Sequence, residues 1–179
     1  MDCSKNSESI LETDRLSLRK LASDDLDSLK LILQDENVMY AYEHAFDHEE
    51  VRDWLNRQLQ RYERDGFGLW AVILRETGEF IGQCGITFQE CHEDMVHEVG
   101  YLFRHDFWGK GYATEAANAC KSYAFQHLET SKLYAIIRDM NTPSKRVAER
   151  IGMQKEGTLV KHYYGVTMPH DIFSIRREA

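Results

Sequence analysis

Apolar residues recur at two spacings along the chain, and the change of spacing predicts where strands and helices lie. After a polar lead of about ten residues, apolar and polar positions alternate over 16–21, and this period of two predicts an opening strand. The spacing then becomes helical up to about Gln34, with Ser23 or Asp24 in place to cap the helix. The stretch 35–46 has no clear period, so we expect a loop there that lines a pocket.

A second helix is predicted between Asp47 and Gly66. Asp47 followed by Glu50 has the spacing of a capping box, and Gly66 is suited to end the helix. The apolar stripe of this helix consists of Val51, Trp54, Leu55, Leu59 and Tyr62.

Three strand-like runs follow the second helix. They lie at 69–75, 80–88 and 95–103. The first two are joined by the short polar segment ETGE, which predicts a hairpin, and the third follows another polar turn. We therefore expect an antiparallel meander of three strands.

The rest of the chain alternates helices and strands. Small residues at helical spacing predict a helix over 113–128, and the apolar run 132–138 predicts a buried strand. A short helix is expected with Pro143 in its first turn and Gly152 as its stop. Two shorter strands are expected around 158–164 and 170–176.

Length and composition favour one folded domain. The chain has 179 residues, of which 42% are hydrophobic, enough to form a core. It shows no internal repeat and no linker. We predict a flexible N-terminus over 1–10 and a single domain of mixed α and β structure over 11–179.

Hydropathy and charge exclude several classes of protein. Mean hydropathy is -0.54, and no apolar run approaches the roughly 20 residues that span a bilayer. The first ten residues lack the basic and apolar regions of a secretory signal, so a cytoplasmic protein is expected. A net charge of -8 disfavours nucleic acid as a partner and would suit a cationic substrate.

Cysteine and histidine spacings do not indicate a metal site. The four cysteines show no C-x-x-C pair, and Cys84 and Cys120 lie in apolar patterns, as small buried residues do. His44 and His48 are four residues apart but straddle the predicted start of the second helix. No metal ligand is therefore predicted.

The segment most informative about chemistry lies between Tyr101 and Glu115, where a strand leads through a glycine-containing loop into a helix. Gly109 and Gly111 would let the free N–H groups of the helix N-terminus approach a phosphate or pyrophosphate. Lys110 either adds positive charge at the rim or is a solvated lysine. A plain helix-opening turn is the alternative, and neither a P-loop nor a Rossmann fingerprint is present.

These residues resemble the pyrophosphate loop of the GNAT superfamily of acetyl-CoA-dependent N-acetyltransferases, which reads Q/R-x-x-G-x-G/A. The stretch F-W-G-K-G-Y-A-T-E-A at 107–116 has tryptophan where Gln or Arg is usual, and is similar to the ribosomal-protein alanine N-acetyltransferase (RimJ/RimL-like) branch. Two further matches are N-T-P-S at 141–144 with A-E-R-I-G-M at 148–153, and T-D-R-L-S-L-R at 13–19. The resemblance extends from about residue 11 to 176.

The resemblance implies an α/β GNAT fold with a mixed sheet of six to seven strands and about four helices. The strand ending at Phe103 and the strand 132–138 would be a splayed central parallel pair, with the pantetheine arm of acetyl-CoA between them. Backbone groups of 101–103 would bind that arm. The implied cofactor-binding residues are Tyr101, Leu102, Phe103, Trp108, Gly109, Lys110, Gly111, Tyr112, Ala113, Thr114, Asn141 and Ser144.

Glu98 is the predicted general base, because several family members carry a carboxylate on this strand. A substrate ammonium with a pKa of about 8 to 10 must lose a proton before it attacks. Alternatively, Glu98 orders the strand or binds a nearby cation. His97 would point to the opposite face of the sheet.

Ser144 matches the N-x-x-S position and is the predicted proton donor to the departing thiolate. A backbone or cofactor contact is its alternative role. Asn141 would contact the pantetheine arm or hold a water, and a plain turn-forming asparagine is the alternative. Tyr163 and Tyr164 are either walls of the amine pocket or ordinary strand residues.

The resemblance implies an acyltransferase that moves acetyl from acetyl-CoA to a primary amine by direct attack in a ternary complex. The acceptor is either a protein N-terminal α-amino group or a small amine, and the excess of carboxylates would favour a cationic one. The alternative is a CoA-binding sensor or scaffold with little transferase activity, and a covalent acetyl-cysteine route is a minor variant. Homodimers are frequent in the family; neither nucleic acid nor a membrane is an expected partner.

Overall fold

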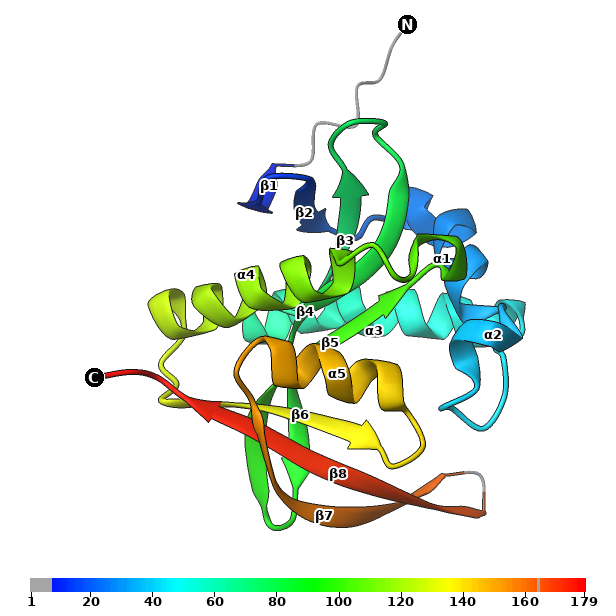
Figure 1. The fold of residues 1–179 in the computed structure, drawn as a ribbon. Coiled ribbons are helices and arrows are strands. Elements are labelled where there is room, and N and C mark those ends of the chain that lie inside the picture. Colours follow the sequence, from blue (N-terminus) through cyan, green and yellow to red (C-terminus); the bar gives the residue numbers. More distant parts are fainter. Residues whose placement is uncertain (1–7, 164) are drawn as a thin grey trace, which may run out of the picture.

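The fold centres on a mixed β-sheet (Figure 1). The computed structural model describes residues 8–163 and 165–179, and these contain eight strands in the order β1-β2-β3-β4-β5-β6-β8-β7. The strands are β1 (Ser9–Glu12), β2 (Leu16–Lys20), β3 (Leu69–Leu74), β4 (Phe80–Cys91), β5 (Asp94–Phe103), β6 (Lys132–Arg138), β7 (Gln154–Tyr163) and β8 (Val166–Arg176). The predicted mixed α/β fold is confirmed.

Helices cover both faces of the sheet. They are α1 (Leu26–Leu33), α2 (Glu36–Met39), α3 (His48–Asp65), α4 (Tyr112–His127) and α5 (Thr142–Arg150), with short 3-10 turns at Ser23–Asp25 and His105–Phe107. In Figure 1, α4 and α5 lie in front of the sheet and α3 lies behind it. Trp70 of β3 is fully buried, and its ring meets that of Tyr123 on α4 at 5.0 Å. Within the described ranges, no helix combines the length and apolar character that a bilayer crossing needs.

The signals at the ends of α3 act as predicted. The Asp47 carboxylate accepts a hydrogen bond from the Glu50 N–H at 2.8 Å, and the Glu50 carboxylate accepts one from the Asp47 N–H at 2.9 Å. Gly66 ends the helix in the left-handed conformation, with φ of 81°. The predicted capping box and stop are confirmed.

The parallel pair β5 and β6 separates soon after it forms. Glu98 and Tyr134 are the one registered pair between these strands, and residues 101–103 are registered with β4 on their other side. The edge of β5 that faces β6 is therefore open at 101–103. The predicted splayed pair is confirmed, and the opening lies beside α4 and α5.

Several elements differ in length from the prediction. β1 and α2 were not predicted, since each has only four residues and shows too little periodicity. Ser9 and Ile10, placed in the N-terminal segment 1–10 by the prediction, lie in β1; residues 1–7 are outside the described residues. The sheet has eight strands instead of six to seven. β7 and β8 are both longer than expected. β7 is largely exposed and has few apolar residues that would have indicated its full length.

Candidate active site

The G-K-G loop lies at the N-terminus of α4, in the conformation that its glycines permit. Gly109 and Gly111 have φ of 76° and 81°, values that residues with a side chain rarely adopt. Gly111 is the N-cap of α4 and offers no side-chain cap. The first N–H groups of the helix are therefore left for a ligand.

Arg15 binds this loop from the other end of the chain. Its Nη1 donates to the Lys110 carbonyl at 2.9 Å, and its Nε pairs with the Glu115 carboxylate at 2.7 Å. The guanidinium also lies 4.4 Å from the centre of the Tyr112 ring. Thr13 donates to the same carboxylate at 2.6 Å. The T-D-R segment thus holds the glycine loop against the first turn of α4.

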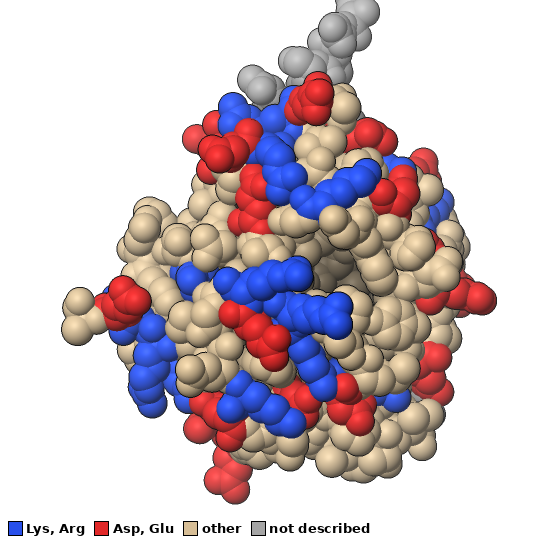
Figure 2. All heavy atoms as spheres, in the orientation of Figure 1, with Lys and Arg blue, Asp and Glu red and all other residues tan. Residues whose placement is uncertain are grey.

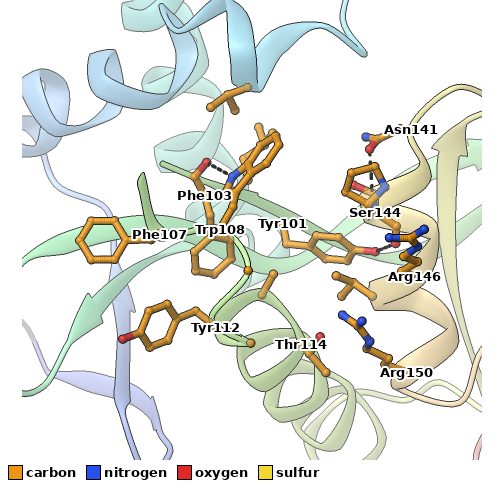
Figure 3. Close-up of a pocket in the computed structure, with 17 residues that line it drawn as sticks. Tyr101, Phe103, Phe107, Trp108, Tyr112, Thr114, Asn141, Ser144, Arg146 and Arg150 are labelled. Atoms are coloured by element: carbon orange, nitrogen blue, oxygen red, sulfur yellow. Dashed lines mark hydrogen bonds between the residues drawn. The ribbon is translucent and has the colours of Figure 1, made fainter. Parts of the chain in front are cut away.

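A first cavity of about 340 Å³ opens between the splayed strand and the N-termini of α4 and α5 (Figure 3). Of the predicted cofactor residues, Tyr101, Leu102, Phe103, Trp108, Gly109, Gly111, Tyr112, Ala113, Thr114, Asn141 and Ser144 line it. Lys110 does not line the cavity, and its ammonium lies 5.2 Å from the centre of the Phe107 ring.

Trp108 fixes the end of β5. Its indole N–H donates to the Phe103 carbonyl at 2.9 Å, and its ring packs edge-on against His105 at 4.9 Å. Tryptophan at this loop position therefore ties the loop back to the strand that it leaves.

Asn141 and Tyr101 organise the start of α5. The Asn141 side chain caps the helix by accepting from the Ser144 N–H at 3.3 Å, and it also accepts from the Tyr40 hydroxyl at 2.9 Å. The Tyr101 hydroxyl donates to the Ser144 carbonyl at 2.6 Å. Asn141 thus caps α5 and also lines the first cavity, and Ser144 faces this cavity from the first turn of α5 (Figure 3).

A second cavity of about 560 Å³ lies on the other side of Tyr101 and Leu102, which line both cavities. Its walls come from α3, the segment 41–46, and the ends of β6, β7 and β8. Of the predicted loop 35–46, Glu36–Met39 form α2 instead, and residues of the segment 41–46 line this cavity. Four cationic and two anionic side chains line this cavity, which is the opposite of what the net charge of the chain suggested; they are Arg57, Arg61, Arg138, Lys161, Glu43 and Glu98.

Glu98 lies in the second cavity, where β5 and β6 separate. Burial raises the pKa of its carboxyl from 4.5 to about 7, although Lys161, the Ile136 N–H and Arg61 act in the opposite direction. Ile136 donates its N–H to Glu98 Oε2 at 3.0 Å. His97 packs instead against Phe88 and Phe67, at 4.5 and 5.6 Å between ring centres, and lines neither cavity.

Comparison with known proteins identifies the family. Residues 15–154 match the model of the acetyltransferase (GNAT) domain. The chain belongs to the GNAT acetyltransferase family. This GNAT protein is therefore an acyltransferase.

Relatives cover almost the whole GNAT chain. The uncharacterized protein YkkB of Bacillus subtilis is 40% identical over 157 residues, which are 87% of this chain and 91% of the relative. The crystal structure of a GNAT-family acetyltransferase from Bacillus anthracis superposes with a TM-score of 0.78 at 28% identity, covering 93% and 97% of the two chains. RimL, a ribosomal L7/L12 α-N-protein acetyltransferase solved with coenzyme A, has a TM-score of 0.76 at 16% identity over 94% and 98%, and that likeness shows the fold alone.

Two arginines of this GNAT domain were missed from the sequence. Arg146 and Arg150 lie one turn apart on α5, and both line the first cavity (Figure 3). Figure 2 shows Lys and Arg side chains gathered beside a hollow over the region of α4 and α5. The i, i+4 spacing of Arg146 and Arg150, on a helix predicted to start at the cofactor site, was the sequence signal that could have identified them.

The histidines and tyrosines considered in the sequence analysis can now be placed in the GNAT fold. His44 Nε2 bonds to Glu50, and His48 Nε2 lies 3.0 Å from Arg52. Among the residues described, no cluster of His, Cys, Asp and Glu is suited to hold a metal ion. Tyr163 lines the second cavity, while Tyr164 lies outside the described residues.

The buried cysteines behave as predicted. Cys84 and Cys120 are fully buried, with their sulfur atoms 3.6 Å apart as free thiols. Burial raises the pKa of the Cys84 thiol well above its usual value, which keeps it from acting as a thiolate nucleophile.

Proposed function

We propose that this protein transfers the acetyl group of acetyl-CoA to a primary amine by direct attack within a ternary complex. One observation carries the proposal: two cavities meet at Tyr101 and Leu102, on the open edge of β5. The first cavity reaches the uncapped N-terminus of α4, and the second contains Glu98. This arrangement suits a cofactor and an acceptor that approach one point from opposite sides.

The donor groups of the first cavity fit acetyl-CoA. The free N–H groups of the first turn of α4 and the guanidinium groups of Arg146 and Arg150 suit the phosphates. The unpaired edge of β5 at 101–103 offers backbone groups to the amides of the pantetheine arm. When bound, acetyl-CoA would supply the thioester that is attacked.

Glu98 is the base in this proposal. A carboxyl with a pKa of about 7 is largely ionised at neutral pH and remains basic enough to take a proton from an ammonium group, directly or through a water molecule. The backbone N–H groups along 101–103 are the candidates to stabilise the developing oxyanion.

Ser144 is the proton donor in this proposal. It lines the first cavity, and within the described part of the chain its hydroxyl makes no hydrogen bond, so Oγ is available to the departing sulfur. The proton that Ser144 gives up would be replaced from solvent.

Calorimetric titration with acetyl-CoA and a screen for thiol release with amines and N-terminal peptides test the proposal. We expect binding in the range of about 1 µM to 1 mM and thiol release with at least one amine. A folded protein that binds no acetyl-CoA would contradict the proposal. Binding without release from any acceptor would indicate a CoA sensor instead.

A further inference from the structure

The second cavity concentrates positive charge in an acidic protein. Arg57 and Arg61 lie one turn apart on α3, Arg138 ends β6, and Lys161 lies on β7. Glu43 and Glu98 are the carboxylates of the same lining. Because the chain has 30 acidic and 22 basic residues, this local excess of cations opposes the overall balance.

These four cations lack carboxylate partners. Within residues 8–163 and 165–179, none of them forms an ion pair. Arg61 Nη1 donates to the Gln58 side chain at 3.2 Å, and Arg138 Nη1 donates to the Ala41 carbonyl at 3.2 Å. Burial, Arg57 and Arg64 together lower the pKa of Arg61. Glu43 and Glu98 balance only part of the four positive charges, and an excess of positive charge in a partly dehydrated cavity attracts an anion.

Two hydrogen-bond donors at this cavity are also without partners. Arg138 Nε and Gln58 Nε2 are buried, and neither finds an acceptor among the described residues. Gln58 is fully buried and lines the cavity. Its Oε1 is held by the Leu69 N–H at 3.1 Å and by Arg61, so the amide is fixed with Nε2 left over. A buried donor without an acceptor costs free energy, so the wall of this cavity contains two polar atoms that the described residues do not satisfy.

We propose that the acceptor carries an anionic group, a carboxylate or a phosphate, in addition to its amine. This inference rests on the proposed function, with the amine directed to Glu98 and the anionic group bound by the cations of the second cavity. The volume of about 560 Å³ is that of a site for a small molecule. An amine without negative charge would leave the four cations without an ion pair.

Matched pairs of acceptors test the proposal. Each pair consists of an amine that carries an anionic group (the anionic member) and a counterpart that lacks that group (the neutral member): β-alanine and β-alaninamide, phosphoethanolamine and ethanolamine, and an acidic tripeptide and the same peptide with every carboxylate amidated. We expect kcat/KM to be at least about tenfold higher for the anionic member of a pair, and the pair with the larger ratio distinguishes carboxylate from phosphate. If neutral members react equally well or better, this inference fails while the proposed transferase function stands.

Binding of the anions alone keeps the inference testable without turnover. Protein saturated with CoA is titrated with inorganic phosphate and with succinate. We expect one of these anions to bind and, at saturation, to inhibit transfer to a neutral amine competitively. If neither anion binds to the CoA-loaded protein, the inference is overturned whether or not transfer occurs.

Variants assign the effect to the cavity. Lys161→Gln removes one cation from a partly exposed strand position, and Arg138→Gln removes the cation with the unpaired Nε. Assayed at pH 9, well above the pKa of Glu98, each should lower kcat/KM for the anionic member about tenfold and for the neutral member less than twofold. Arg52→Gln, on α3 outside the cavity, is the control and should change neither. Equal losses for both members of a pair would contradict the proposal.

Discussion

The Glu98 carboxylate accepts a hydrogen bond from the backbone N–H of Ile136, 3.0 Å away, across the gap between β5 and β6. The last registered pair of these strands is Glu98 with Tyr134, two residues earlier on β6. Oε2 thus takes the place of a strand carbonyl, while Oε1 makes no hydrogen bond to the described residues. Oε2 thus holds β6 where it separates from β5, and Oε1 is available to a substrate. The two expected roles of Glu98, ordering the strand and acting as a general base, are therefore compatible.

Glu98→Gln separates these two roles. The amide oxygen of Gln still accepts from Ile136, so the fold is retained, but the side chain cannot take a proton. We expect kcat to fall about 100-fold or more at pH 8, while calorimetry finds acetyl-CoA affinity changed less than twofold. Unchanged turnover would remove Glu98 from the role of base.

The pH dependence of turnover follows from the same carboxyl. Since its pKa is about 7 and the base must be ionised, log kcat/KM should rise through pH 7 and level off above it. The cations Arg61 on α3 and Lys161 on β7 oppose the effect of burial, so Lys161→Gln should move the midpoint upward. Initial rates between pH 5.5 and 9 measure this. A log kcat/KM that does not rise near pH 7 would contradict this prediction. The same rise in Glu98→Gln would also contradict it.

The free energy of unfolding should fall as pH rises, whereas turnover should increase. The pKa of Glu98 is higher in the folded state, so the folded protein binds more protons than the unfolded chain between about pH 4.5 and 7. This contribution is fully present below pH 4.5 and is lost as pH rises through 7, a change of up to about 3 kcal/mol. Urea unfolding at pH 5 and 8 should show a smaller decrease for Glu98→Gln than for the wild type. An equal decrease in the free energy of unfolding for both proteins would contradict this prediction.

The contacts of Arg15 predict a selective effect on cofactor binding. Arg15→Ala releases the Lys110 carbonyl and the Glu115 carboxylate, and thereby loosens the glycine loop. Since Arg15 is partly exposed, we expect a moderate rise of about three- to tenfold in KM for acetyl-CoA, with kcat nearly unchanged. Arg52→Ala on the exposed face of α3 is the control. A fall in kcat with constant KM would show that Arg15 does not act through the loop.

The close approach of β4 to the residue that precedes β3 predicts a sensitive glycine. A Cβ at Gly85 would stand 2.0 Å from the Gly68 carbonyl oxygen, and backbone cannot move aside easily. Gly85→Ala should lower the free energy of unfolding by about 3 kcal/mol or more. Gly157→Ala, whose Cβ would meet Ile172 at an ordinary 3.8 Å, should cost less than about 1 kcal/mol. Urea unfolding of both variants compares them directly.

Local signals in the sequence predicted local structure well. Spacing was enough to predict the capping pair Asp47 and Glu50 and the loop glycines, because each acts within a few residues of its own position. The splayed pair of strands came from the family resemblance. β1 and α2 escaped because four residues are too few for a period.

Contacts between distant segments could not be predicted in this way. Arg15 reaches Lys110, and the Tyr101 hydroxyl reaches the Ser144 carbonyl, across 95 and 43 positions of sequence. The cations of the second cavity are similar: each looks like a solvated charge where it stands in the sequence, and only the meeting of α3, β6 and β7 brings them together.

The position of Tyr101 has a further consequence, because this residue lines both cavities and its hydroxyl binds the Ser144 carbonyl of α5. Any displacement of this ring by a molecule in one cavity changes the shape of the other. The affinities for the two substrates are then linked, and linkage is reciprocal: acetyl-CoA must alter acceptor affinity by the same factor as the acceptor alters that of acetyl-CoA. The same reciprocity would hold between the equilibrium affinities for product CoA and for the acetylated product.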